Sequence, residues 1–235
     1  MTDATIDAAR LDALAAYDTP TICNALEVAR PERRGFGFTV RTLIAPFPGL
    51  KPMVGFARTA TIRSGQLPGR PPAEVRKQRM AYYRYVGEGA APKVSLIQDL
   101  DDTPGLGSFW GEVNSAIHKA CGCVGVVTNG AIRDLDAIAP GFNMLSGTVV
   151  PSHIWAHLVD YACDVNIAGM VARHDDLIHA DRHGAVVIPL DAVDAVLRAA
   201  DLVTRKEAPI LACARSSDFT VDALEAAFGE ADDIH

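Results

Sequence analysis

The sequence lacks the long apolar segments that mark membrane and secreted proteins. No apolar run approaches the ~20 residues that a membrane-spanning helix needs, and no basic start leads into an apolar stretch with a cleavage site. We therefore expect no membrane partner, no signal segment and a cytoplasmic location.

Cysteines in a pattern typical of disulfide frameworks or zinc sites are also missing. The five cysteines are odd in number and include no CxxC pair. The nearest approach to a metal motif is Cys121-Gly122-Cys123, which lies between a helical stretch and an apolar strand. We interpret these two cysteines as small buried residues.

The sequence has no excess of positive charge, since 22 Lys and Arg residues stand against 29 Asp and Glu residues and the formal net charge is -7. A nucleic-acid surface needs clustered Lys and Arg, so no nucleic-acid partner is expected. One basic cluster has helical spacing and predicts a solvated helix face, although local charge can still attract a small anionic substrate. Its members are Arg70, Arg76, Lys77, Arg79 and Arg84.

What is present is enough apolar sequence for one sizeable core. With 235 residues and 49% hydrophobic content, residues 1–235 are predicted to form a single domain with a frayed acidic tail near 230–235. Thr19 reads as a helix N-cap, and residues 30–52 predict an irregular connection or an extra strand around 36–44.

The periodicity of apolar residues predicts helices and strands that alternate in the first half of the chain and strands that cluster in the second. This mixture favours an α/β sandwich over a regular doubly wound sheet. Helices are predicted at 6–17, 112–120, 193–203 and 221–228 and in the segment after 72, and strands at 54–62, 94–98, 124–128, 147–150, 165–171, 177–180 and 185–188.

The most informative stretch runs from Gly111 to Asp134. Gly111 precedes a predicted helix, so the first backbone amides, those of Glu112, Val113 and Asn114, have no intrahelical partner and can bind an anion. A substrate carboxylate fits such a position.

Arg133 and Asp134 follow at the start of the next short helix. The planar guanidinium suits a bidentate carboxylate contact, and Asp134 is a candidate ligand for Mg²⁺, which takes only one or two protein carboxylates. A second acid would act through water, either Glu112 or one of Asp99, Asp101 and Asp102. By itself, such a pair is more often a helix cap or a surface ion pair.

Two segments resemble the signature of the class II pyruvate aldolase family, which contains 4-hydroxy-4-methyl-2-oxoglutarate aldolases, oxaloacetate decarboxylases and regulators of ribonuclease E activity. They are Trp110 to Val113 and Gly125 to Asp134. A third segment, Asp176 to Pro189, is similar to a second recurrent stretch of that family. The resemblance covers roughly residues 10 to 210.

The resemblance implies a mixed β/β/α swivelling-type sandwich that assembles as a homotrimer or homohexamer with active sites at subunit interfaces. It also implies a lyase that cleaves or decarboxylates a small 2-keto acid through a pyruvate enolate, with Mg²⁺ or Mn²⁺ as cofactor.

Residue by residue, the resemblance implies that Gly111 to Asn114 bind the keto acid through backbone amides. Arg133 would bind its carboxylate or ketone oxygen, and Asp134 would hold the metal. Glu112 stands in the place of an acid that acts through water on the metal, and Glu207 loosely matches an acid from the neighbouring subunit.

The chain departs from the family pattern at two positions. Asn129 stands where the family usually has Asp, and Ala137 where it has an acid that Asp136 could replace in part. Two alternatives to a lyase therefore stay open. One is a non-catalytic regulator that binds an RNA-processing enzyme, and the other is a related metal-dependent hydrolase or hydratase.

Histidines are the remaining candidates for a site. His153 and His157 are four residues apart, a spacing that can bind zinc, but no Glu lies between them. We predict structural or surface roles for both and for His174. His183, near His179, lies in the second family-like stretch and stays a candidate to line the site.

Overall fold

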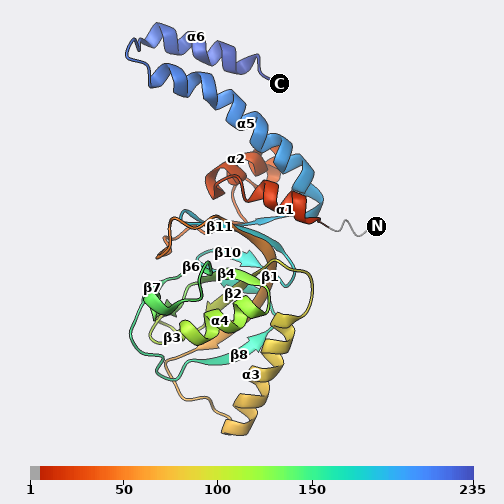
Figure 1. The fold of residues 1–235 in the computed structure, drawn as a ribbon, viewed down its shortest axis with the longest axis vertical. Helices are drawn as coiled ribbons and strands as arrows, with labels where there is room; N and C mark the ends of the chain where they lie inside the picture. The colour runs from red at the N-terminus through yellow and green to blue at the C-terminus, as the bar shows by residue number, and fades with distance from the viewer. Residues whose placement is uncertain (1–5) are drawn as a thin grey trace.

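The structure, a computed structural model, describes residues 6–235, and its centre is a curled mixed sheet (Figure 1). Four neighbouring strands run parallel: β1 (Met53–Arg63), β2 (Lys93–Asp99), β4 (Cys123–Thr128) and β6 (Asn143–Leu145). Three antiparallel additions complete the sheet: β8 (His157–Tyr161) and β11 (Leu177–Asp181) beside β1, and β12 (Gly184–Ile188) beside β11.

Two small sheets accompany the large one. The parallel strands β3 (Ser108–Trp110), β5 (Ala131–Ile132) and β7 (Thr148–Val149) follow turns at the carboxyl ends of the main strands. The other small sheet is the hairpin of β9 (Val165–Ile167) and β10 (Met170–Ala172), which packs its apolar residues against the main sheet.

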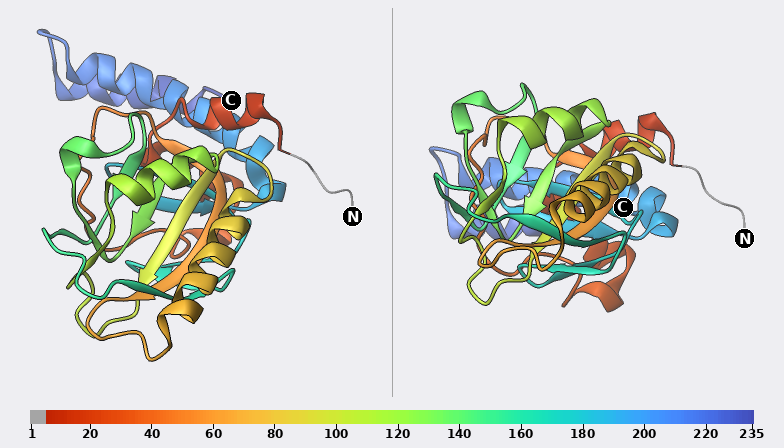
Figure 2. Two further views of the ribbon diagram at one scale, coloured as in Figure 1. Left: turned by 60° about the horizontal axis from the view of Figure 1, so that its bottom comes forward. Right: turned by 90° about the horizontal axis from the view of Figure 1, so that it is seen from below.

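The helices cover the sheet on separate sides, which the turned views make visible (Figure 2). One layer packs on β11 and β12 and consists of α1 (Ala8–Leu14), α2 (Thr19–Ala29) and the first half of α5 (Val193–Ala214). The other contains α3 (Pro72–Gly87) and α4 (Glu112–Ala120), with Trp110, Tyr82 and Phe142 buried beneath them. The predicted mixed α/β architecture is confirmed.

Several elements differ from the sequence-based prediction. Residues 165–171 form the hairpin instead of one strand, because Ala168 and Gly169 both have positive φ and reverse the chain. Strands β3, β5, β6 and β8 were not predicted. Asp18, not Thr19, is the N-cap of α2, since the Asp18 carboxylate accepts a hydrogen bond from the Thr21 amide.

The segment 30–52 is irregular, which confirms the prediction of an irregular connection and not the alternative of an extra strand around 36–44. It contains one turn of 3₁₀ helix, η1 (Pro31–Arg33), and its backbone forms isolated β-bridges from Phe38 to Val186 and from Ile44 to Ser146. The other short 3₁₀ turns are η2 (Leu135–Ala137) and η3 (Leu190–Ala192).

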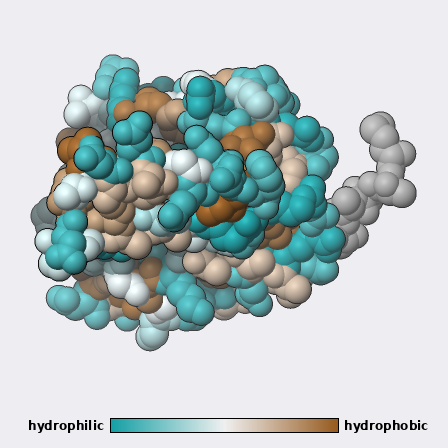
Figure 3. Space-filling view, turned by 90° about the horizontal axis from the view of Figure 1, so that it is seen from above, coloured by the Kyte–Doolittle hydropathy of each residue, from teal (hydrophilic) through white to brown (hydrophobic). Residues whose placement is uncertain are grey.

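The C-terminal helices are longer than predicted. Helix α5 continues to Ala214 and α6 (Val221–Asp232) folds back along it, so the pair projects from the body in Figure 1. Viewed from that side, apolar residues appear as small patches between polar ones (Figure 3). In the described part of the chain, no helix has the length and apolar character needed to cross a membrane.

Candidate active site

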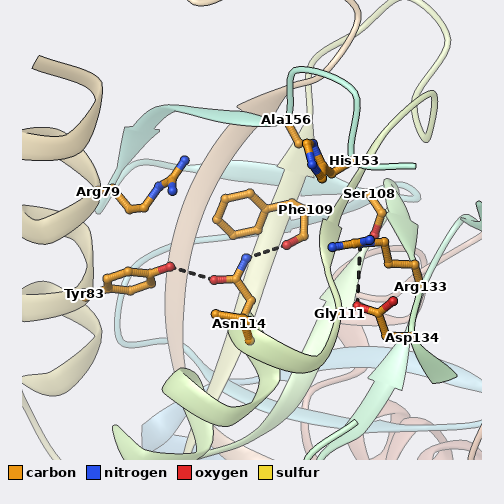
Figure 4. Close-up of a pocket in the computed structure, with 11 residues that line it drawn as sticks. Arg79, Tyr83, Ser108, Phe109, Gly111, Asn114, Arg133, Asp134, His153 and Ala156 are labelled. Atoms are coloured by element: carbon orange, nitrogen blue, oxygen red, sulfur yellow. Dashed lines mark hydrogen bonds and ion pairs between the residues drawn. The ribbon is translucent and has the colours of Figure 1, made fainter. Parts of the chain in front are cut away.

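The predicted residues Gly111, Arg133 and Asp134 meet in one pocket at the N-terminus of α4 (Figure 4). The cavity has a volume of about 240 Å³, enough for a small organic acid. Its other lining residues come from α3, β3, α4 and the turn before β8: Arg79, Tyr83, Ser108, Phe109, Val113, Asn114, His153 and Ala156.

The backbone conformation of Asp134 and the absence of a side chain at Gly111 together place the Asp134 carboxylate at the N-terminus of α4. Its φ of 55° is in the left-handed region, which Asp tolerates better than most residues, and it begins η2. Its Oδ2 accepts a hydrogen bond from the Glu112 amide at 3.3 Å and lies 3.6 Å from Arg133 Nε. A Cβ at position 111 would overlap that same oxygen, so glycine is required for this approach.

Asn114 fixes the first turn of α4 against two other elements. Its side-chain amide donates to the Phe109 carbonyl, and its oxygen accepts from the Tyr83 hydroxyl at 2.7 Å. The dashed lines in Figure 4 show this bridge across the pocket. The Asn114 side chain is therefore occupied by the protein, and only the backbone amides of this turn are available to an anion.

Glu112 and Val113 take different positions from their neighbours. The Glu112 side chain is exposed and does not line the pocket, while its amide already bonds to Asp134. Val113 lines the rim with a side chain that is 69% exposed. The amides of this turn that remain available to an anion are thus those of Val113 and Asn114, and the role of the Glu112 carboxylate stays a prediction.

A buried pair beneath the pocket supports α4. The Tyr82 hydroxyl donates to His118 Nε2 at 2.8 Å, while His118 Nδ1 donates to the Asn114 carbonyl at 2.7 Å. Both side chains have no exposed area. Burial lowers the pKa of His118 to about 4, so the ring is neutral in the folded protein at neutral pH.

This pair predicts a defined loss of stability in acid. The His118 pKa is lower folded than unfolded, so the unfolded chain binds more protons, and stability falls as pH decreases from about 6.5 to about 4. The full effect is on the order of 3 kcal/mol. Urea unfolding at pH 7.5 and 5 should show a smaller pH dependence in His118→Gln than in wild type; an identical dependence would contradict the assignment.

The other acids proposed for the site, Asp99, Asp101 and Asp102, lie outside the pocket. Asp99 is buried and accepts from the Asp101 and Gly105 amides, and burial raises its pKa. Asp101 accepts from the Ser64 and Gly65 amides and the Ser64 hydroxyl. Neither residue, nor Asp102, lines the pocket of Asp134.

Comparison with known proteins identifies the family. The family model described as RraA-like, Aldolase/RraA, matches residues 19–187, which is more than half of the chain. The chain belongs to the RraA-like family. No curated protein matches it.

Solved structures share the fold of this RraA-like chain at low identity. An uncharacterized protein from Pseudomonas syringae pv. tomato str. DC3000 superposes with a TM-score of 0.72 and 22% identity over 96% of this chain and 95% of its own. Streptomyces coelicolor RraAS2 is described as an unusual member of the RNase ES inhibitor RraA protein family. It superposes with a TM-score of 0.68 and 20% identity over 86% of this chain and 95% of its own. The RNA-processing inhibitor RraA from Thermus thermophilis superposes with a TM-score of 0.51 and 18% identity over 70% of this chain and 90% of its own.

The departure from the family pattern at Asn129 has a structural explanation. Asn129 Oδ1 accepts from the Asp99 amide at 2.8 Å, and its Nδ2 donates to the Asp99 carbonyl at 3.0 Å. The side chain thus joins the carboxyl ends of β2 and β4 and does not line the pocket of Asp134. A carboxylate at position 129 could make only the first of these bonds.

We therefore expect Asn129→Asp to lower the free energy of unfolding by about 1–3 kcal/mol, because the Asp99 carbonyl would face a carboxylate oxygen. The control is Asn166→Asp, since exposed Asn166 uses only its acceptor oxygen, toward the Gly169 amide. Urea unfolding of both variants at pH 7.5 measures the difference. Equal, small losses in the two variants would show that the Asn129 donor contributes nothing.

The second departure, at Ala137, leaves Asp134 as the one carboxylate among the residues that line the pocket. Ala137 is exposed, and Asp136 lies along a separate groove with Leu50 and Phe142. Within residues 6–235 no group of three or more His, Cys, Asp or Glu could hold a metal. A closed zinc site does not fit this arrangement. One partly exposed carboxylate in an open pocket does fit Mg²⁺ or Mn²⁺, which fill their coordination shells with water and substrate oxygens.

Sequence reasoning missed Arg79 and His153, which both line the pocket. Arg79 was assigned to a solvated face; it is exposed, but α3 turns it toward Arg133 (Figure 4). It shares the pocket-facing side of α3 with Tyr83, four residues later, and this i, i+4 relation to an aromatic residue was the available signal.

The remaining histidines lie outside the pocket. His157 is buried in β8, and buried His179 bonds to Thr19, to the Leu14 carbonyl at the end of α1 and to the Tyr17 carbonyl that follows. His174 pairs with Asp175, and His183 with Asp181. His183, the candidate from the second family-like stretch, therefore does not line the pocket with Arg133.

Proposed function

We propose that this chain is a Mg²⁺- or Mn²⁺-dependent carbon-carbon lyase that cleaves or decarboxylates a small 2-keto acid. The observation that carries the proposal is the convergence of Arg133, Asp134 and the Gly111 turn in one small pocket, in a chain of the RraA-like family. A cation, an anion and free helix amides side by side match the groups of a chelating acid.

The protein's own groups bind and orient the substrate in this proposal. The Arg133 guanidinium binds the carboxylate or ketone oxygen, and the Val113 and Asn114 amides bind the remaining carboxylate oxygen. Phe109, between Arg79 and Arg133 in Figure 4, provides an apolar wall. These contacts hold the bond to be broken in one orientation.

Asp134 is the residue that would hold the ion. When bound, the ion acts as a Lewis acid that stabilises the negative charge of the pyruvate enolate. The pocket lining contains no lysine that could form a Schiff base. By the family resemblance, Glu112 is the acid that acts on the metal through water. Glu207, exposed on α5, is the acid that a neighbouring subunit would contribute. Trimeric or hexameric assembly and a cytoplasmic location are further parts of this proposal.

The direct test is pyruvate release from oxaloacetate by the purified protein with Mg²⁺, with Mn²⁺ and with a chelator. Decarboxylation is the least demanding reaction, because it needs only the groups that bind the substrate carboxylate and the ion. We expect turnover above the metal-only background that disappears with chelator and returns with added metal. Turnover at the metal-only rate would contradict the proposal.

A further inference from the structure

We propose that His153 is a catalytic residue, and that its Nε2 takes the hydroxyl proton of the substrate and returns it to the enolate. The inference rests on the proposed lyase function and deepens it. Nothing in the family resemblance assigns this residue, which lies in the turn between β7 and β8 and lines the pocket above the Arg133 guanidinium (Figure 4).

The turn that carries His153 is tied to the pocket wall. The Ser108 amide donates to the Ser152 carbonyl at 3.0 Å, the Ile154 amide to the Ser152 hydroxyl at 3.1 Å, and the Ala156 amide to the His153 carbonyl at 2.8 Å. A Cβ at Gly107 would overlap the His153 carbonyl oxygen, so β3 approaches the turn closely. The backbone under the imidazole is thus fixed from both sides.

One hydrogen bond fixes the tautomer of the ring. His153 Nδ1 lies 2.8 Å from the Ile154 carbonyl oxygen. A carbonyl can only accept, so Nδ1 carries the hydrogen and, in the neutral ring, Nε2 has the free lone pair. Ile154 holds its carbonyl in this position with a φ of 41°, a conformation that costs a β-branched residue about 1–3 kcal/mol. Strain of this kind is typical of functional sites.

The other polar groups of the pocket do not compete for this role. A guanidinium group, as in Arg79 and Arg133, offers only hydrogen-bond donors, and Asp134 is the proposed ligand of the ion. The Tyr83 hydroxyl donates to Asn114, and burial raises its pKa. The Glu112 carboxylate is outside the lining. Among the lining residues, the imidazole of His153 is therefore the group suited both to accept and to release a proton.

The proposed step is balanced without any external reactant. Nε2 takes the C4 hydroxyl proton of a 4-hydroxy-2-keto acid, the oxygen electrons form a carbonyl, and the C3–C4 bond breaks to leave its electron pair on the enolate. The Nε2 proton then moves to C3 and gives pyruvate, which restores the neutral ring. Decarboxylation differs because CO₂ leaves without prior removal of a proton.

The test compares His153→Gln with His183→Gln, a variant of another partly exposed histidine whose partner is Asp181. Both are assayed with Mg²⁺ on 4-hydroxy-4-methyl-2-oxoglutarate, on oxaloacetate, and for deuterium exchange of the pyruvate methyl group in D₂O. We expect His153→Gln to lose about 10²- to 10³-fold in kcat for aldol cleavage and in methyl exchange. It should keep most of its kcat for decarboxylation, and added imidazole should restore part of the cleavage rate.

Other outcomes overturn the inference in distinguishable ways. Unchanged cleavage and exchange in His153→Gln would exclude proton transfer by His153 while leaving the lyase proposal intact. Equal losses for cleavage and decarboxylation would assign His153 to positioning the pocket. Wild-type protein that is inert in all three assays would overturn the lyase proposal and this assignment together.

Discussion

Replacing Asp134 with asparagine is expected to abolish metal-dependent pyruvate release, lowering kcat on the order of 10³-fold. Asparagine keeps the size of the side chain and can still accept the hydrogen bond from the Glu112 amide, so the fold should be preserved. It removes the negative charge that attracts a hard divalent ion. Pyruvate release from oxaloacetate and Mn²⁺ binding followed by electron paramagnetic resonance measure the two consequences.

The matched control is Asp136→Asn, two residues further along the same segment. Asp136 is exposed and lies along the groove with Leu50, away from the Arg133 pocket. We expect unchanged turnover and Mn²⁺ binding in this variant. Full activity of Asp134→Asn with bound Mn²⁺ would exclude Asp134 as the metal ligand.

Replacing Arg133 with alanine should reduce kcat/KM by about 100-fold, equivalent to ~3 kcal/mol, because the charged hydrogen bonds to the substrate are lost. Arg133 is 35% exposed on its side chain, and its closest acid is the neighbouring Asp134, so its guanidinium can turn to a ligand. Lysine at this position restores the charge without the planar fork and should recover only part of the loss.

Steady-state kinetics on oxaloacetate separate the contributions of Arg133. A rise in KM alone indicates binding of the ground state, and a fall in kcat indicates contact with the charge that develops in the transition state. Arg173→Ala is the control, since this exposed arginine pairs with Asp164 and lies outside the pocket. Equal kinetics in the two variants would contradict the role of Arg133.

The central strands could be predicted because their burial is nearly complete. Strands β1, β2 and β4 have almost continuous buried residues, and such runs are visible in the sequence. The β9–β10 hairpin could not be predicted, because its turn uses Ala168 with φ of 52°, where glycine or asparagine is expected. Strand β8 has only His157 and Leu158 buried, so its sequence carries no continuous buried run, and it depends on pairing with β1.

Part of the site was also within reach of the sequence. Gly111, Arg133 and Asp134 are close to helix starts, and the helix-start pattern is local. Arg79 and His153 enter the pocket through tertiary packing: α3 is oriented by buried Tyr82 and Val86, and the His153 turn by its bonds to β3. Helical spacing shows which residues share a face, but it does not show which face the rest of the chain covers.

The Asp134 pocket is proposed to break a carbon-carbon bond with the help of a divalent metal. Pyruvate release from 4-hydroxy-4-methyl-2-oxoglutarate by wild type and Asp134→Asn, each with Mg²⁺ and with chelator, tests it most directly. We expect release only from wild type with Mg²⁺. Absence of release from all four samples, or release that is equal in all of them, would contradict it; the first of these results would favour the non-catalytic regulator that binds an RNA-processing enzyme.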